Sequence, residues 1–91
     1  MYIIQTTNRF EKDVLKCEKR GFNLALLKEA MLLLAKTGKL PDKYKTHKLA
    51  EKYTGCFECH IKPDWLLIWQ QNDNILTLLF LNTGTHPDLF K

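Results

Sequence analysis

The chain has 91 residues, of which 45% are hydrophobic, and its formal net charge is +4. This length allows one domain, spanning residues 1–91, with a single two-layer core, and the hydrophobic content argues against a disordered chain. No apolar run reaches the roughly 20 residues that cross a membrane, and the first residues lack the pattern of an export signal, so we expect a cytoplasmic protein without membrane contact.

The first part of the sequence predicts one strand followed by two helices. Residues 2–6 are rich in β-branched side chains and predict a short strand. Asn8 and Glu11 match the pattern of a capping box and predict the start of a helix. Asn23 caps a second helix with leucines at helical spacing, and Gly38 ends it. Two adjacent helices with a short link predict an αα-hairpin.

The second part of the sequence predicts three strands after a long loop. Residues 37–54 show little periodicity and predict a long basic loop. Residues 55–62 alternate between two faces and predict a strand, and residues 65–70 are apolar on both faces and predict a central strand. Residues 75–81 predict a third strand, and residues 88–90 predict one closing helical turn.

These elements follow the order β-α-α-β-β-β, with a short helical turn at the C-terminus. The order predicts an α+β fold, in which the αα-hairpin packs on one face of a mainly antiparallel sheet. Side chains at alternate positions of strand 55–62, among them Glu58 and His60, share one face. We expect these two on the face that the helices leave open, where a ligand can bind.

The three cysteines predict neither a disulfide nor a metal site. Their number is odd, and the chain shows no export signal. Cys56 and Cys59 form a C-x-x-C motif, but residues three apart on a strand point to opposite faces. The sequence contains no second C-x-x-C to complete a zinc site. We therefore interpret all three cysteines as ordinary small side chains.

Positive charge is concentrated between residues 36 and 62. This segment contains seven lysines and three acidic residues, and the only lysine or arginine after Lys62 is Lys91. One interpretation is a solvated, lysine-rich loop. The segment also carries His47 and two tyrosines and leads into the strand with His60, which favours the binding of phosphate groups.

Three histidines and one aspartate are the strongest candidates for chemistry. His47 lies in the predicted basic loop, His60 on a strand, Asp64 in the turn that follows, and His86 near the C-terminus. No histidine falls in a predicted helix, and no H-x-x-H or H-E-x-x-H motif is present, so we expect neither a metal nor another cofactor. One alternative stays open: each histidine could simply hydrogen-bond a backbone group at the end of a loop.

Such a set of side chains suits the cleavage of RNA without a metal ion. The 2′-OH attacks the adjacent phosphorus, one side chain removes its proton, and another protonates the leaving 5′-oxygen. Histidine titrates near neutral pH and can play either role, while cationic groups neutralise the charge that develops on phosphate. A flanking Phe90 or Trp65 would stack on an unpaired base. Because this chemistry requires the 2′-OH, we expect no direct action on DNA.

Three segments of the sequence carry these candidates in recognisable motifs. They are Y-K-T-H-K-L at 44–49, C-H-I-K-P-D-W-L-L-I-W at 59–69, and T-G-T-H-P-D-L-F at 83–90. Together they resemble the YafQ branch of the RelE/ParE toxin superfamily. The resemblance implies a RelE-like fold and a ribosome-dependent endonuclease that cuts mRNA codons in the ribosomal A site without a metal. It also implies contacts with ribosomal RNA and inhibition by a cognate antitoxin protein.

The resemblance further implies roles for particular side chains. It assigns catalysis to His47, His60, Asp64 and His86, with Asp64 and His86 as the pair that moves protons. His47 and His60 would then orient the scissile phosphate or stabilise its charge. The side chains expected to contact substrate are those of Phe90, Trp65, Lys45, Lys48, Lys52 and Lys62.

Two positions depart from the pattern of the family, because many relatives carry arginine where Phe57 and Asn82 stand. Two further functions therefore stay open. A ParE-like protein uses the same fold as a binding module that poisons a topoisomerase, and that role does not require the histidine and aspartate set. A non-cleaving relative would bind only RNA or the ribosome, which the loss of two arginines would favour.

Overall fold

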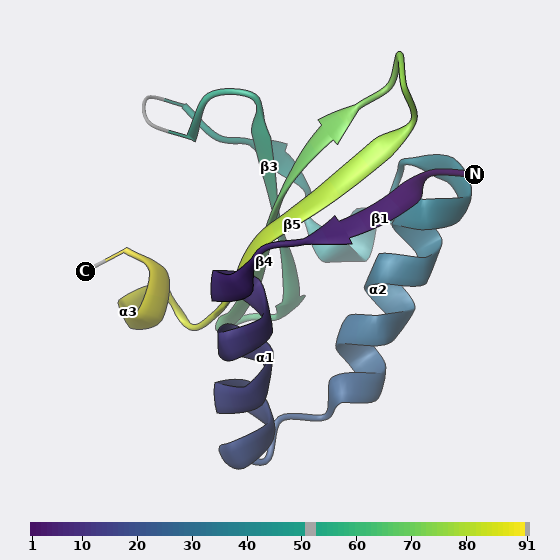
Figure 1. Ribbon diagram of the computed structural model, residues 1–91. Helices are drawn as coiled ribbons and strands as arrows, with labels where there is room; N and C mark the ends of the chain where they lie inside the picture. The colour runs from purple at the N-terminus through teal and green to yellow at the C-terminus, as the bar shows by residue number, and fades with distance from the viewer. Residues whose placement is uncertain (51–52, 91) are drawn as a thin grey trace.

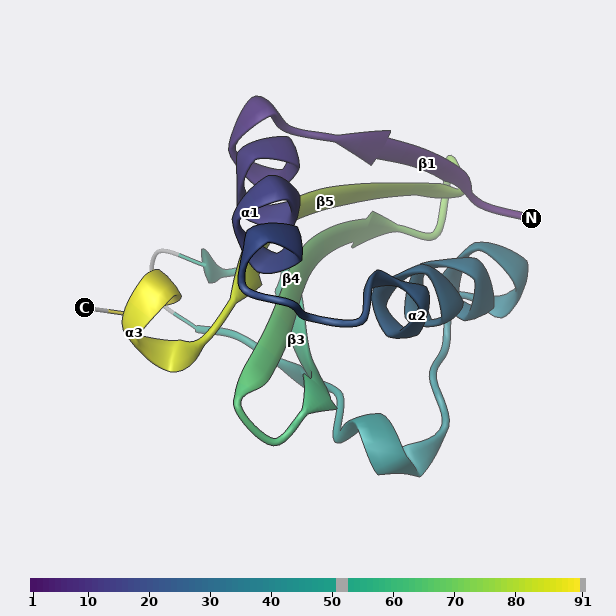
Figure 2. The ribbon, with the colours of Figure 1, turned by 90° about the horizontal axis from the view of Figure 1, so that it is seen from below.

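A computed structural model describes residues 1–50 and 53–90 of the chain. It contains a five-stranded sheet with the strand order β1-β5-β4-β3-β2, and helices α1 and α2 lie on one face of it (Figure 1, Figure 2). β1 runs parallel to β5, and the other neighbouring strands are antiparallel. The elements are β1 (Ile3–Thr6), α1 (Asn8–Lys19), α2 (Leu24–Thr37), the 3-10 helix η1 (Asp42–Tyr44), β2 (His47–Lys48), β3 (Cys56–Lys62), β4 (Trp65–Asn72), β5 (Thr77–Gly84) and α3 (His86–Leu89).

The structure confirms the α+β class and adds two short elements to the predicted order. η1 and β2 both lie in the segment 37–54, which the sequence predicted as one long loop. That prediction was wrong in part, because elements of three and two residues are too short to show periodicity. β2 pairs with β3 so that His47 lies opposite Glu58. The pairing carries a candidate residue to the edge of the sheet.

Hydrogen bonds at the helix ends show which residues delimit α1 and α2. The N-cap of α1 is Thr7, whose Oγ1 accepts a hydrogen bond from a backbone N–H of the first turn at 3.0 Å. The predicted capping box of Asn8 and Glu11 was therefore wrong, because Thr7 already satisfies that N–H group and Asn8 is the first helical residue. Asn23 as the N-cap of α2 and Gly38 as its left-handed C-cap, with φ 73°, are confirmed.

β4 is the central strand, as predicted, and its first five residues, 65–69, are all buried. Its Trp69 and Leu67 form one core with Phe80 of β5 and with Phe10 and Leu34 of the helices. This core fastens the two helices to the sheet and leaves the strand ends and connections free to carry polar groups. In the part of the chain that the structure describes, no helix is long and apolar enough to cross a membrane.

α1 also fastens the C-terminal end of β5. The pairing between β4 and β5 skips Leu81, which makes a bulge in β5. Asp13 of α1 accepts hydrogen bonds from the Thr83 backbone N–H at 3.1 Å and from the Asn82 side-chain amide at 3.3 Å. Thr7 Oγ1 donates to the Leu81 carbonyl at 3.1 Å. Side chains of α1 thus satisfy the polar groups that the bulge displaces.

α3 follows β5 directly and is held against α1 by an ion pair. The Asp88 carboxylate accepts two hydrogen bonds from the Arg20 guanidinium, at 2.6 and 3.1 Å, and lies 3.4 Å from Lys16 Nζ. It also accepts the Thr85 backbone N–H at 2.9 Å. The Arg20 hydrogen bonds hold the pKa of Asp88 well below its usual range. A Cβ at Gly84 would lie 2.8 Å from Asp88 Oδ2, so glycine permits this close approach.

We expect Arg20→Gln to lower the free energy of unfolding by about 1 kcal/mol at pH 7, because it removes both bonds to the partly buried Asp88 carboxylate. A carboxylate whose folded-state pKa is lowered contributes stability above its unfolded pKa and loses that contribution as the pH falls. The difference from wild type should therefore shrink between about pH 4 and pH 2.

Urea unfolding over this pH range measures the effect. Lys12→Gln, at an exposed position of the same helix, is the matched control and should change the stability little at any pH. A loss in Arg20→Gln that stays constant with pH would contradict the role of the ionised Asp88.

Candidate functional site

The candidate site lies on the face of the sheet that α1 and α2 leave open. On β3, Cys59 belongs to the helix-side core, and Phe57 and Ile61 pack against that core. Because side chains alternate along a strand, Glu58 and His60 point to the opposite face, as predicted. The candidate site therefore lies on one face of β3, and the side chains on the opposite face of this strand pack into the core.

Two imidazole rings meet on this face. The ring centroids of His47 and His60 are 6.4 Å apart. His47 Nε2 lies 3.0 Å from Glu58 Oε1, and His47 Nδ1 lies 3.2 Å from the Lys45 carbonyl oxygen. His60 Nδ1 lies 3.2 Å from the Pro63 carbonyl oxygen. Hydrogen bonds within the fold thus orient both rings.

The turn between β3 and β4 brings Asp64 to the start of α3. The His86 backbone N–H lies 3.5 Å from Asp64 Oδ1, at the long limit of a hydrogen bond. The His86 and Phe90 ring centroids are 5.7 Å apart, and Phe90 meets Tyr53 edge to face at 5.8 Å. Asp64, His86 and Phe90 are all exposed. The structure therefore brings the four predicted catalytic residues together in two pairs. His47 lies beside His60, and Asp64 lies beside the backbone of His86.

Lysines surround one side of His60. A hollow of about 270 Å³ is lined by Lys43, Lys45 and Lys62 together with His60, Ile61 and Pro63. Lys45 adopts a left-handed conformation, with φ 50°, where the chain leaves η1 for β2. Cationic side chains at this spacing next to an imidazole suit the binding of a phosphate group.

Three other residues were predicted to contact substrate, namely Trp65, Lys48 and Lys52, and their positions in the structure differ. Trp65 is only 3% exposed, packs against Phe22 with ring centroids 4.9 Å apart, and donates its Nε1–H to Thr83 Oγ1 at 2.9 Å. The structure contradicts the prediction that Trp65 stacks on a base, because the core encloses its ring. Lys48 is exposed on β2, and Lys52 lies outside the described residues.

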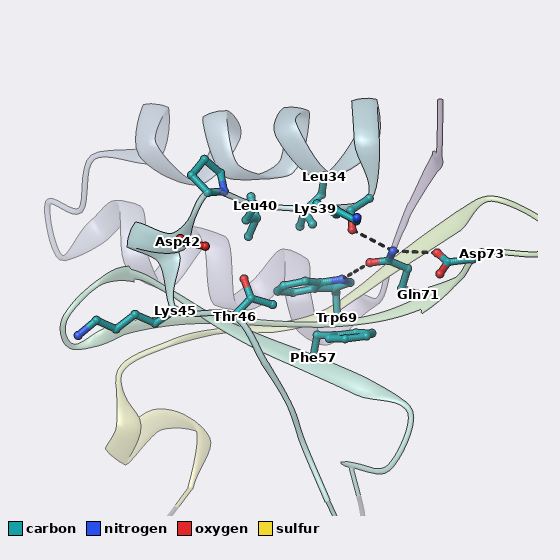
Figure 3. Close-up of a pocket in the computed structure, with 12 residues that line it drawn as sticks. Leu34, Lys39, Leu40, Asp42, Lys45, Thr46, Phe57, Trp69, Gln71 and Asp73 are labelled. Carbon is teal, nitrogen blue, oxygen red and sulfur yellow. Dashed lines mark hydrogen bonds between the residues drawn. The ribbon is translucent and has the colours of Figure 1, made fainter.

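Of the two positions that depart from the family pattern, Phe57 faces the helix side. Phe57 stacks on Trp69, with ring centroids 5.7 Å apart and 19° between the planes, beside a pocket of about 470 Å³ under α2 (Figure 3). In that pocket Gln71 accepts from Trp69 Nε1 at 3.0 Å and donates to the Gly38 carbonyl at 3.1 Å. Asn82 donates to a carboxylate of α1. Phe57 therefore contributes no side chain to the candidate site, whereas Asn82 pairs with Ile68 in the same cross-strand row as Glu58.

The cysteines fill space, as predicted. All three are free and buried, and burial raises the pKa of the Cys59 thiol to about 12. Cys59 belongs to the helix-side core, whereas Cys56 does not. Among the described residues, no group of three or more histidine, cysteine, aspartate or glutamate side chains is arranged to hold a metal ion.

Sequence reasoning missed three contacts of this site. Glu58 contacts His47, Tyr53 contacts Phe90, and Lys43 lines the cationic hollow. The alternation of β3 placed Glu58 on the correct face, but its partner arrives on β2, a strand that the sequence did not predict. Tyr53 lies in a connection without periodicity, so no local signal could have found it.

Known proteins resemble this chain over nearly its whole length. Residues 2–91 match the family described as the bacterial toxin of type II toxin-antitoxin system, YafQ. The chain is 40% identical over 88 residues to the mRNA interferase toxin YafQ of Escherichia coli strain B / BL21-DE3, which covers 96% of this chain and 94% of that protein.

Solved structures extend the match to the fold. The crystal structure of YafQ from E. coli strain BL21(DE3) superposes with a TM-score of 0.91 at 37% identity, over the whole of both chains. A chain of the crystal structure of the E. coli DinJ-YafQ complex matches with a TM-score of 0.89 at 38% identity, again over both whole chains. Because sequence and structure agree over nearly the full length, the chain belongs to the YafQ family of toxins of bacterial type II toxin-antitoxin systems.

Proposed function

We propose that this toxin is an endoribonuclease that depends on the ribosome and cleaves mRNA in the A site, in the cytoplasm. The observation that supports the proposal is the contact between the His47 and His60 rings beside a lysine-lined hollow, together with the approach of Asp64 to the His86 backbone. The activity named for the E. coli relative supports the same conclusion.

The reaction that we propose occurs within the RNA chain. The O2′ atom forms a bond to phosphorus while the bond from phosphorus to O5′ breaks, which leaves a 2′,3′-cyclic phosphate and a free 5′-hydroxyl. Asp64 takes the proton of the 2′-OH, and His86 gives a proton to O5′. Asp64 lies in the β3–β4 turn and His86 at the start of α3, and the His86 backbone N–H lies 3.5 Å from Asp64 Oδ1, so both residues can reach one substrate.

Binding of the substrate requires charge and stacking besides proton transfer. His47, His60 and the lysines of the adjacent hollow neutralise the phosphate as negative charge develops on its oxygens. Phe90, supported edge to face by Tyr53, provides an aromatic surface for an unpaired base beside His86. Cleavage in this scheme uses only side chains, without a metal step.

The expected partners are ribosomal RNA, mRNA and an antitoxin protein. The lysines near the site suggest the first two, and membership of the family suggests the third. The exposed Lys45 and Lys48, between η1 and β3, offer contacts for ribosomal RNA and message, since phosphate contacts supply most of the affinity for nucleic acids. Control of the toxin requires an antitoxin, and the complex of the E. coli relative with DinJ supports a partner protein of that class.

The first test replaces both proton-transfer residues. We expect the Asp64→Ala, His86→Ala double variant to cleave messages at least about 100-fold more slowly than wild type, because general acid–base catalysis contributes at least that much. Mapping of new 5′ ends in messages after expression measures the rate.

The control is Glu18→Ala, which removes an exposed acidic side chain from α1 and should cleave normally. Circular dichroism and thermal unfolding verify that the double variant keeps its fold. Normal cleavage by a folded double variant would overturn the assignment of both residues.

The second test concerns the ribosome. We expect purified toxin to cut mRNA on programmed ribosomes at the A-site codon and to leave the same naked mRNA intact, because the lysine-rich surface must engage ribosomal RNA to place the message. Equal cleavage of naked mRNA would contradict the ribosome dependence. Breaks in DNA with intact messages would instead favour a ParE-like topoisomerase poison, and ribosome binding without new 5′ ends would favour a non-cleaving relative.

The third test concerns metal ions. We expect a chelator selective for transition metals to leave cleavage unchanged at a Mg²⁺ concentration that keeps ribosomes intact, since side chains alone transfer the protons in the proposed reaction. Cleavage by a metal-dependent nuclease under the same conditions serves as the control for chelation. Loss of cleavage that returns on addition of one transition metal would contradict the proposed mechanism.

A further inference from the structure

Glu58 is a buried carboxylate in a site whose other groups are exposed or half-buried. It is 5% exposed, and its Oε1 lies 3.0 Å from His47 Nε2. A buried carboxylate is costly unless a hydrogen bond or an opposite charge compensates it. His47 provides that compensation, since β2 and β3 pair in a register that puts His47 directly opposite Glu58. The contact is thus imposed by the backbone pairing of two strands.

The second nitrogen of His47 is also occupied by an acceptor. His47 Nδ1 lies 3.2 Å from the carbonyl oxygen of Lys45. A carbonyl and a carboxylate both accept hydrogen bonds, whereas a neutral imidazole carries only one N–H group. Only the imidazolium form of His47 donates to both partners at once. In that form the ring retains no lone pair with which to take a proton from a substrate.

His60 contrasts with this arrangement. Its Nδ1 faces the carbonyl oxygen of Pro63 at 3.2 Å, and among the described contacts Nε2 has no partner. A neutral ring satisfies this single contact. The contacts of His60 therefore require one ring N–H group, whereas those of His47 require two. The charged and titratable groups that surround the His47 ring are Glu58 and His60 of β3 and the neighbouring Lys45 and Lys48 of its own segment.

We propose that Glu58 is a positioning residue that holds His47 as a fixed cation toward the scissile phosphate. This inference rests on the proposed function and assigns His47 to charge stabilisation, which leaves proton transfer to Asp64 and His86. A cation fixed in advance stabilises the developing phosphorane charge without reorganisation at the moment of reaction. Glu58 acts through His47 and does not itself touch the substrate.

The state of His47 can be measured without any RNA. We expect long-range proton–nitrogen NMR spectra of the free wild-type toxin at pH 7 to show two protonated ring nitrogens in His47. In Glu58→Gln the amide can accept or donate, so the demand for a second N–H disappears, and the His47 spectrum should change to that of a neutral ring. The spectra of His86, which lies on another element, should stay the same in both proteins.

Cleavage on programmed ribosomes tests the consequence for function. We expect Glu58→Gln to cleave about 10- to 100-fold more slowly than wild type, and Glu58→Asp, which keeps the charge, to recover part of that loss. Glu18→Gln, on an exposed position of α1, is the matched control and should cleave at the wild-type rate. A purely structural role would lower the stability of both Glu58 variants without changing the His47 spectrum.

The two measurements separate the inference from the proposed function. A neutral His47 ring in the wild-type spectrum at pH 7 overturns the inference, and this holds even where Glu58→Gln fails to fold. A folded Glu58→Gln variant that cleaves at the wild-type rate also overturns it. A wild-type toxin that shows the imidazolium spectrum but cleaves no message overturns the proposed function, while the Glu58–His47 contact itself stands.

Discussion

The arrangement of this protein depends on the burial of β4 from both sides. Trp69 and Leu67 pack against the helices, whereas Leu66 and Ile68 are fully buried without belonging to that core. Burial of apolar surface is the main favourable contribution to folding, and a strand buried on both faces fixes its neighbours on each side. β3 and β5, which flank β4, are therefore rigid, and they carry the site at their ends and on the face away from the helices.

A second requirement is the attachment of the C-terminal segment to α1. Asp13 satisfies the backbone around the β5 bulge, and Arg20 holds the Asp88 carboxylate of α3. α3 is only one turn long and buries no residue, so packing alone gives it little support. Its catalytic candidate His86 thus owes its place to polar contacts with a helix from the other end of the chain. Residues of α1 and its C-cap thus support the segment that carries this candidate residue.

The site combines groups that differ in how firmly the fold holds them. His47 and His60 sit on paired strands with ring nitrogens bonded within the protein, whereas Asp64 and His86 lie exposed at a turn and at a helix start. A group that supplies charge works best when it is fixed in advance, and a group that moves a proton must reach the substrate. The buried Glu58 carboxylate lies 3.0 Å from His47 Nε2, so this contact ties the His47 ring on β2 to β3.

Local patterns in the sequence predicted the fold class, the ends of the second helix at Asn23 and Gly38, and the two faces of β3, because capping and alternation are local properties. Motif resemblance added the family and the candidate residues. Three features became visible only in the folded chain: the strand β2, the enclosure of Trp65 by the core, and the contact between Glu58 and His47. These features depend on which distant segment arrives beside a residue, and a local pattern carries no information about that partner.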